Sequence, residues 1–141
     1  MVSCIKFSLW VLVLVLALDF ACSDRGVAHV TLQVVNDVDP NWVPYTTVVT
    51  VPAGQSVYKL LLIARETIPG FTFEATYHAQ WGHHVTSINH LAADDNVNTF
   101  WQLEDMNGLP HVQGIDWVYL HEGDTVVWRY TTYDPTGFDF D

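Results

Sequence analysis

Four histidines crowd one short stretch of the chain: His78, His83, His84 and His90. Imidazole is the commonest transition-metal ligand and titrates near neutral pH, so such a group could hold a metal ion or move protons. No His-Glu-x-x-His or Cys-x-x-Cys spacing accompanies these residues. In a strand, His83 and His84 would point to opposite faces and could chelate one ion only at a backbone bulge. The pattern therefore favours solvated or hydrogen-bonded histidines over a metal site.

Other reactive groups do not form a recognisable catalytic set. After residue 23 the only serines are Ser56 and Ser87, and neither lies in a Gly-x-Ser-x-Gly turn. Asp94-Asp95-Asn96-Val97-Asn98 places oxygen ligands at alternate positions, as a calcium loop does, but Thr99 replaces the glycine that such a loop requires. With fifteen acidic residues after residue 23, some carboxylate pair falls at any given separation by chance. We expect a protein that is not an enzyme.

Large aromatic side chains are the second candidate for chemistry, because they line ligand sites as well as filling cores. Five tryptophans follow residue 23: Trp42, Trp81, Trp101, Trp117 and Trp128. Most of them must belong to the core of a chain this short. Trp81 stands beside Gly82 outside any clear strand pattern, so its ring either contacts a ligand or simply lies on the surface.

The spacing of hydrophobic residues along the chain predicts the helix and the strands that position these side chains. The spacing of Val57, Leu60, Leu61, Ala64 and Ile68 predicts one helix over about residues 56–68, with Ser56 as N-cap and Pro69-Gly70 as the stop. Alternation predicts a hairpin of strands 27–35 and 45–51, with Val30, Leu32 and Val34 on one face. Five more strands are expected at 71–76, 85–89, 99–104, 117–120 and 125–133. We therefore predict an α+β domain with a mostly antiparallel sheet and one packed helix.

The first residues predict export. The apolar run from Leu9 to Leu18 follows Lys6 and is too short to span a bilayer, as is typical of a signal peptide. We expect cleavage after about Ser23, leaving one domain at 24–141 that lacks Cys4 and Cys22; the alternative is an uncleaved anchor. That domain carries four basic and fifteen acidic residues, a net charge of −11, which disfavours nucleic acid as a partner. The expected location is extracellular, with no membrane span after cleavage.

Several short motifs stand in one particular order along the chain. They are Pro52-Ala53-Gly54-Gln55-Ser56, Phe71-Thr72-Phe73-Glu74, Trp81-Gly82, Ser87-Ile88-Asn89, Phe100-Trp101-Gln102-Leu103 and Gln113-Gly114-Ile115, followed by the turn Glu122-Gly123-Asp124. In this order the chain resembles the C-terminal β-rich domain of the cobalamin carriers, the family of transcobalamin and gastric intrinsic factor. The resemblance extends from the first expected strand to Tyr133, as a stand-alone secreted domain.

The resemblance implies vitamin B12 (cobalamin) binding or transport, with no covalently bound cofactor. In the family this domain closes over one side of the corrin, which implies a ligand-binding region made of Trp81, Gly82, His83, His84, Val85, Phe100, Trp101, Gln102 and Leu103. The carriers' helical domain is missing, so a helical partner chain or a receptor is implied, and His83 or His84 could stand in for an axial cobalt ligand. The alternative is an extracellular module on the same scaffold that binds a protein or a glycan.

Overall fold

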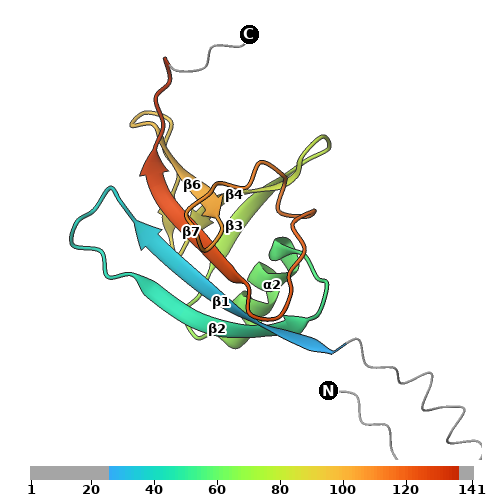
Figure 1. Cartoon of the computed structure of the whole chain (residues 1–141). Coiled ribbons are helices and arrows are strands. Elements are labelled where there is room, and N and C mark those ends of the chain that lie inside the picture. The colour runs from blue at the N-terminus through green and yellow to red at the C-terminus, as the bar shows by residue number, and fades with distance from the viewer. Residues whose placement is uncertain (1–25, 137–141) are drawn as a thin grey trace, which may run out of the picture.

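Two β-sheets and one helix make up the part of the chain that the computed structural model describes, residues 26–136 (Figure 1). The elements are β1 (Val27–Asn36), β2 (Tyr45–Pro52), α2 (Val57–Thr67), β3 (Phe73–His78), β4 (Gly82–Ile88), β5 (Leu91–Ala92), β6 (Thr99–Glu104) and β7 (Thr125–Thr132). The larger sheet has the order β2-β1-β7-β6 and the smaller one β3-β4-β5. Every pairing is antiparallel except that of β1 with β7. The predicted α+β class is confirmed. The expected signal peptide lies outside the described residues.

The single helix forms where the period predicted it. Ser56 is the N-cap and accepts a hydrogen bond from the Lys59 backbone N–H at 3.3 Å, and Ile68 is the C-cap. The apolar stripe, which includes Leu60 and Leu61, is buried. Because Pro69 cannot continue the helix and Gly70 adopts a φ of 81°, the chain turns there toward β3.

Strand alternation places the core between the larger sheet and the helix. Val30, Leu32 and Val34 of β1 are fully buried, as predicted, and the hairpin of β1 with β2 is confirmed. On β7, Trp128 and Tyr130 face the same core, with exposed fractions of 2% and 6%. The sheet therefore buries one continuous apolar face, and this burial is its main source of stability.

The predicted strand at 117–120 is wrong. Val118 and Leu120 are buried while Trp117 and Tyr119 are exposed, so the alternation that suggested a strand exists. Its backbone, however, pairs with the start of the helix: the Val57 N–H donates to the Val118 carbonyl at 2.9 Å, and only one isolated bridge, Ser56 with Tyr119, is formed. A helix start has unpaired N–H groups, and here the loop's carbonyls accept from them.

Smaller differences concern strand ends. The strands predicted at 71–76 and 85–89 occupy 73–78 and 82–88, and they form a hairpin that brings the turn at 79–81 to its tip. The two-residue strand β5 was not predicted, because two residues carry no period. The strand predicted at 99–104 is confirmed with both ends correct.

Candidate functional site

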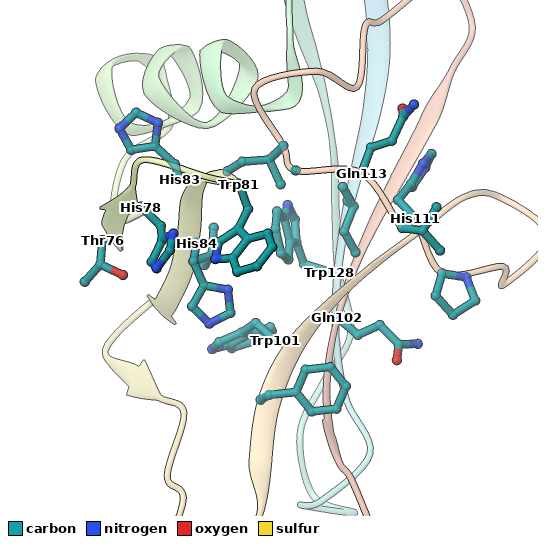
Figure 2. Close-up of a pocket in the computed structure, with 17 residues that line it drawn as sticks. Thr76, His78, Trp81, His83, His84, Trp101, Gln102, His111, Gln113 and Trp128 are labelled. Atoms are coloured by element: carbon teal, nitrogen blue, oxygen red, sulfur yellow. The ribbon is translucent and has the colours of Figure 1, made fainter. Parts of the chain in front are cut away.

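The β3–β4 hairpin, strand β6 and the loop at 110–115 enclose a pocket of about 650 Å³ (Figure 2). Eight of the nine candidate residues from the sequence line this pocket; Gly82 does not. The other lining residues are Thr76, His78, Pro110, His111, Val112, Gln113, Gly114, Ile115 and Trp128. The structure thus brings together segments more than fifty residues apart in the chain.

The lining contains no Asp, Glu, Lys or Arg, although the whole chain carries sixteen acidic and five basic residues. Three indole rings, one phenyl ring, four imidazoles and two carboxamides supply most of the surface. An uncharged pocket with aromatic walls and a few hydrogen-bonding groups suits a largely apolar organic ligand.

Trp81 forms an exposed part of the wall, at the tip of the β3–β4 hairpin. Its side chain is 55% exposed and its ring stacks on His78, with 5.1 Å between the ring centroids. Gly82 follows with a φ of 77°, a conformation that glycine adopts without strain. Gly82 therefore permits the tight turn that carries Trp81, although Gly82 itself does not line the pocket.

His83 and His84 point in different directions, as strand alternation requires. His83 stacks flat on Tyr58 of the helix at 3.7 Å between ring centroids, and its Nδ1 lies 2.8 Å from Oδ1 of Asp116. Figure 2 shows His83 directed toward the helix and His84 gathered with Trp81 and Trp101 in the pocket. Both imidazoles line the pocket, and His84 is the more exposed of the two.

The contact of His83 with Asp116 connects the loop between β6 and β7 to the β3–β4 hairpin. The backbone N–H of His83 also donates to Oδ2 of Asp116 at 2.6 Å. Burial alone would raise the pKa of the Asp116 carboxyl, but these hydrogen bonds from His83 outweigh it and hold the pKa below its ordinary value of 3.8. Asp116 therefore stabilises the fold as a carboxylate.

Replacing Asp116 by alanine is expected to lower the free energy of unfolding at pH 7 by about 2 kcal/mol, because the half-buried donors of His83 lose their charged acceptor. A carboxyl with a lowered folded pKa stabilises above its unfolded pKa, and this stabilisation is lost as pH falls through the folded value. The difference between wild type and Asp116→Ala should therefore be constant above about pH 5 and shrink below pH 3.8. Urea unfolding at several pH values measures it.

The chain offers a matched control in Glu122. Its carboxylate likewise accepts from the backbone N–H of His29 and lies near the ring, but both side chains are more than half exposed. Because solvent screens an exposed pair, Glu122→Ala should change stability much less than Asp116→Ala. Equal effects of the two substitutions would contradict a special role for the Asp116 contact.

Two glycines make the close approach of loop and hairpin possible. A Cβ at Gly114 would overlap the carbonyl oxygen of Trp81 and touch the Trp117 ring, and a Cβ at Gly82 would overlap the Asp116 carboxylate. The Gln113-Gly114-Ile115 motif therefore has a steric reason: only glycine lets the loop cross the hairpin tip. This motif was not among the predicted site residues, because nothing in its local pattern shows that it crosses the hairpin tip.

Strand β6 contributes side chains from both of its faces, because it is the outer strand of its sheet and the pocket lies at this edge. Trp101 is 3% exposed and its Nε1 donates to the Leu91 carbonyl at 2.8 Å. Gln102 lies on the opposite face, where its Nε2 donates to Glu104 at 2.6 Å. Gln102 is thus already engaged, whereas Gln113 makes no side-chain hydrogen bond within the described residues.

Behind Gln102 lies the most buried charge of the described residues. Glu104 is 4% exposed and accepts from Nε of Arg129 at 3.0 Å, while Arg129 also donates to Asp37 at 2.9 Å. Hydrogen bonding to Glu104 raises the pKa of the Arg129 guanidinium above its ordinary value. This network supports the β6 wall of the pocket from the outer face of the sheet.

Metal-ligating groups do not cluster in the described part of the chain: no three His, Cys, Asp or Glu side chains there are arranged to hold an ion. Asp94 to Asn98 form the turn before β6, where Oδ1 of Asp94 accepts from the Asn96 backbone at 2.9 Å. Over residues 26–136, no helix is long and apolar enough to cross a membrane.

Two solved structures have a fold similar to that of this chain. The chain matches haptocorrin, a cobalamin carrier, in complex with Cbi (cobinamide), with a TM-score of 0.67 and 25% identity over 78% of this chain. It spans only 26% of the haptocorrin chain. It also matches, at a TM-score of 0.58 and 16% identity over 76% of this chain and 99% of the other, a protein from Ruminococcus gnavus ATCC 29149 for which metal binding has been suggested. The fold is that of a β-rich domain present in a corrinoid carrier.

The family follows from the sequence itself. The model of the domain of unknown function DUF4430 matches residues 55–132, from the helix N-cap region to the end of β7. The chain belongs to this family. No curated protein matches the chain.

Proposed function

We propose that this protein is a secreted, non-enzymatic carrier that binds a corrinoid of the cobalamin type in the pocket beside Trp81. The observation that carries the proposal is the uncharged, aromatic lining of a pocket of about 650 Å³ in a domain that matches haptocorrin. A corrin is a broad, largely apolar disc with amides at its rim. Flat aromatic walls and a small number of hydrogen-bonding groups are what such a disc requires.

Different pocket residues would contact the apolar face and the amide rim of the corrin. The rings of Trp81 and Trp101 provide flat surfaces on the hairpin and on β6. Gln113 lines the pocket and its amide is not engaged elsewhere in the described chain, so we assign to it the hydrogen bond to an amide of the rim. Gln102 serves instead to hold Glu104, so its contribution to the ligand is by contact only. No covalent bond to the ligand is proposed.

His84 is the better candidate for an axial cobalt ligand. A neutral imidazole nitrogen coordinates transition metals, and the His84 ring has no hydrogen bond within the described residues. His83 is held by Asp116 and covered by Tyr58. His84 would replace an exchangeable ligand on one face of the corrin.

A second protein should cover the other face of the ligand. The pocket is an open hollow whose rim includes exposed Trp81 and Val112, and a corrinoid is too large to be enclosed in it. This chain corresponds to about a quarter of the haptocorrin chain. A helical partner chain or a receptor is therefore part of the proposal.

The direct test is a titration of the purified protein with aquocobalamin and with cobinamide. Calorimetry and tryptophan fluorescence measure the binding during the titration. Saturable binding is expected, and Trp81→Ala should weaken it by at least about tenfold, or about 1.4 kcal/mol. Tyr119→Ala is the control, because Tyr119 is an equally exposed aromatic outside the pocket. No heat and no quenching at high micromolar ligand would rule out binding by this chain alone.

The axial role is tested separately by the visible spectrum of bound aquocobalamin. Exchange of cobalt-bound water for imidazole shifts the absorption bands, so wild type should show a shift that His84→Gln lacks and His83→Gln retains. Binding with identical spectra in all three proteins would remove the axial role and leave the pocket assignment intact.

The second candidate function is an extracellular module that binds a protein or a glycan. The exposed apolar side chains of Trp81, Leu109 and Val112 favour it, because contiguous exposed apolar groups mark interaction sites. A complex that buries the Trp81 loop in the absence of any corrinoid would support this alternative.

A further inference from the structure

Strand β2 forms one edge of the larger sheet and has no strand on its outer side (Figure 1). Its eight residues, Tyr-Thr-Thr-Val-Val-Thr-Val-Pro, carry no acidic or basic side chain. All eight pair with β1 in an unbroken register, so the strand has no bulge. Within the described chain, the outer backbone groups of residues 45–51 make no hydrogen bond to another segment.

The other sheet edges within residues 26–136 are protected. The outer side of β6 is covered by residues 109–111, through the bridge of Glu104 with Pro110 and a 2.9 Å bond from the His111 N–H to the Leu103 carbonyl. Strand β3 carries the exposed carboxylate of Glu74 and an irregular register next to it. Strand β5 has only two residues. Proteins use cover, charge, proline, bulges and short strands to keep edges from pairing, and β2 has only a proline, Pro52, at its last position.

A groove accompanies this open edge. It has a volume of about 440 Å³ and is lined by residues 47–50 of β2 and 67–69 at the end of α2. A strand added beside β2 would direct alternate side chains into this groove, above the helix end. An edge strand next to a helix is a geometry in which proteins accept an additional strand.

The distribution of charge on the chain bears on which strand could pair with the β2 edge. The chain has a net charge of −11, which keeps copies apart over most of the surface. Strand β2 itself, however, carries no charged side chain. Two copies can therefore approach edge to edge at this strip without meeting rows of carboxylates.

We propose that two copies of this chain pair through their β2 strands, antiparallel and related by a two-fold axis, to form one continuous eight-stranded sheet. The partly exposed Thr47 of each copy then lies beside the groove of the other copy, while Val49 stays in the core of its own copy. Such a contact is isologous and closes at the dimer. The pocket beside Trp81 belongs to the β6 edge and stays open, so the dimer does not depend on the corrinoid proposal.

Sedimentation velocity across a concentration series tests the dimer. Wild type should show a concentration-dependent dimer that strengthens with salt, because screening at 0.1 M and above limits charge repulsion to about 10 Å or less. Val48→Lys places a charge at an exposed point of the edge, 62% exposed, and should raise the dimer dissociation constant at least about tenfold, or about 1.4 kcal/mol. Val97→Lys is the matched control, since Val97 is 59% exposed in the turn before β6.

Each outcome decides the proposal. Dimer loss in Val48→Lys but not in Val97→Lys, with unchanged circular dichroism and melting temperature in both, supports pairing through β2. A wild type that stays monomeric to high protein concentration overturns it. So does a dimer that Val48→Lys leaves intact, because that dimer must use another surface, the Trp81 rim included.

Discussion

Replacing Arg129 by methionine should lower the free energy of unfolding by about 3 kcal/mol, measured by urea denaturation at pH 7. The reason lies in Glu104, which is 4% exposed and loses the one cationic partner that it has within residues 26–136. An unpaired carboxylate inside a protein costs far more than the pair itself contributes.

The double variant Arg129→Met with Glu104→Gln separates this cause from lost packing. It removes both charges, so it should be clearly more stable than Arg129→Met alone, as a double-mutant cycle would show. Arg65→Met serves as control, because Arg65 lies over the Phe73 ring at 5.1 Å and has no buried anion beside it. A cost of Arg65→Met equal to that of Arg129→Met would contradict the argument.

Trp101→Ala should cost about 3–5 kcal/mol, because the ring, although it lines the pocket, is only 3% exposed and packs against the core. Trp101→Phe keeps most of the volume but loses the 2.8 Å bond to the Leu91 carbonyl, so it should cost about 1 kcal/mol or somewhat more. Far-UV circular dichroism during urea titration measures both without relying on tryptophan fluorescence.

Trp81→Ala is the comparison that separates the pocket from the core. Its ring is 55% exposed, so its removal should change stability by less than about 1 kcal/mol while ligand binding is weakened. If Trp81→Ala were as destabilising as Trp101→Ala, the hairpin tip would be part of the core and the proposed contact role would fail.

Features that depend on local pattern could be predicted from the sequence. Ser56 and Pro69-Gly70 delimit the helix by capping chemistry, and the period of Leu60, Leu61 and Ala64 marks its buried face. Alternation placed Val30, Leu32 and Val34 inside and gave both ends of β6. These signals require only neighbouring residues, so no knowledge of the remaining chain was needed.

Features that depend on distant contacts could not be predicted in this way. Asp116 lies 33 residues from His83, and no local signal shows that it holds the ring. The segment at 117–120 alternates like a strand, yet its carbonyls accept from the helix start. Trp128 is buried in the core, but it also forms part of the pocket wall, which its strand pattern does not show. Only the order of motifs, interpreted through the family resemblance, indicated the site.

The parallel pairing of β1 with β7 has a consequence for how the protein comes to be folded. The first and last strands of the described chain are neighbours in the middle of the larger sheet, with Leu32 beside Val126. A ribosome must therefore complete β7 before β1 and β6 can each find their shared neighbour. Contacts between segments far apart in the sequence are slow to form, so the newly made domain should remain open and accessible to chaperones until β7 emerges.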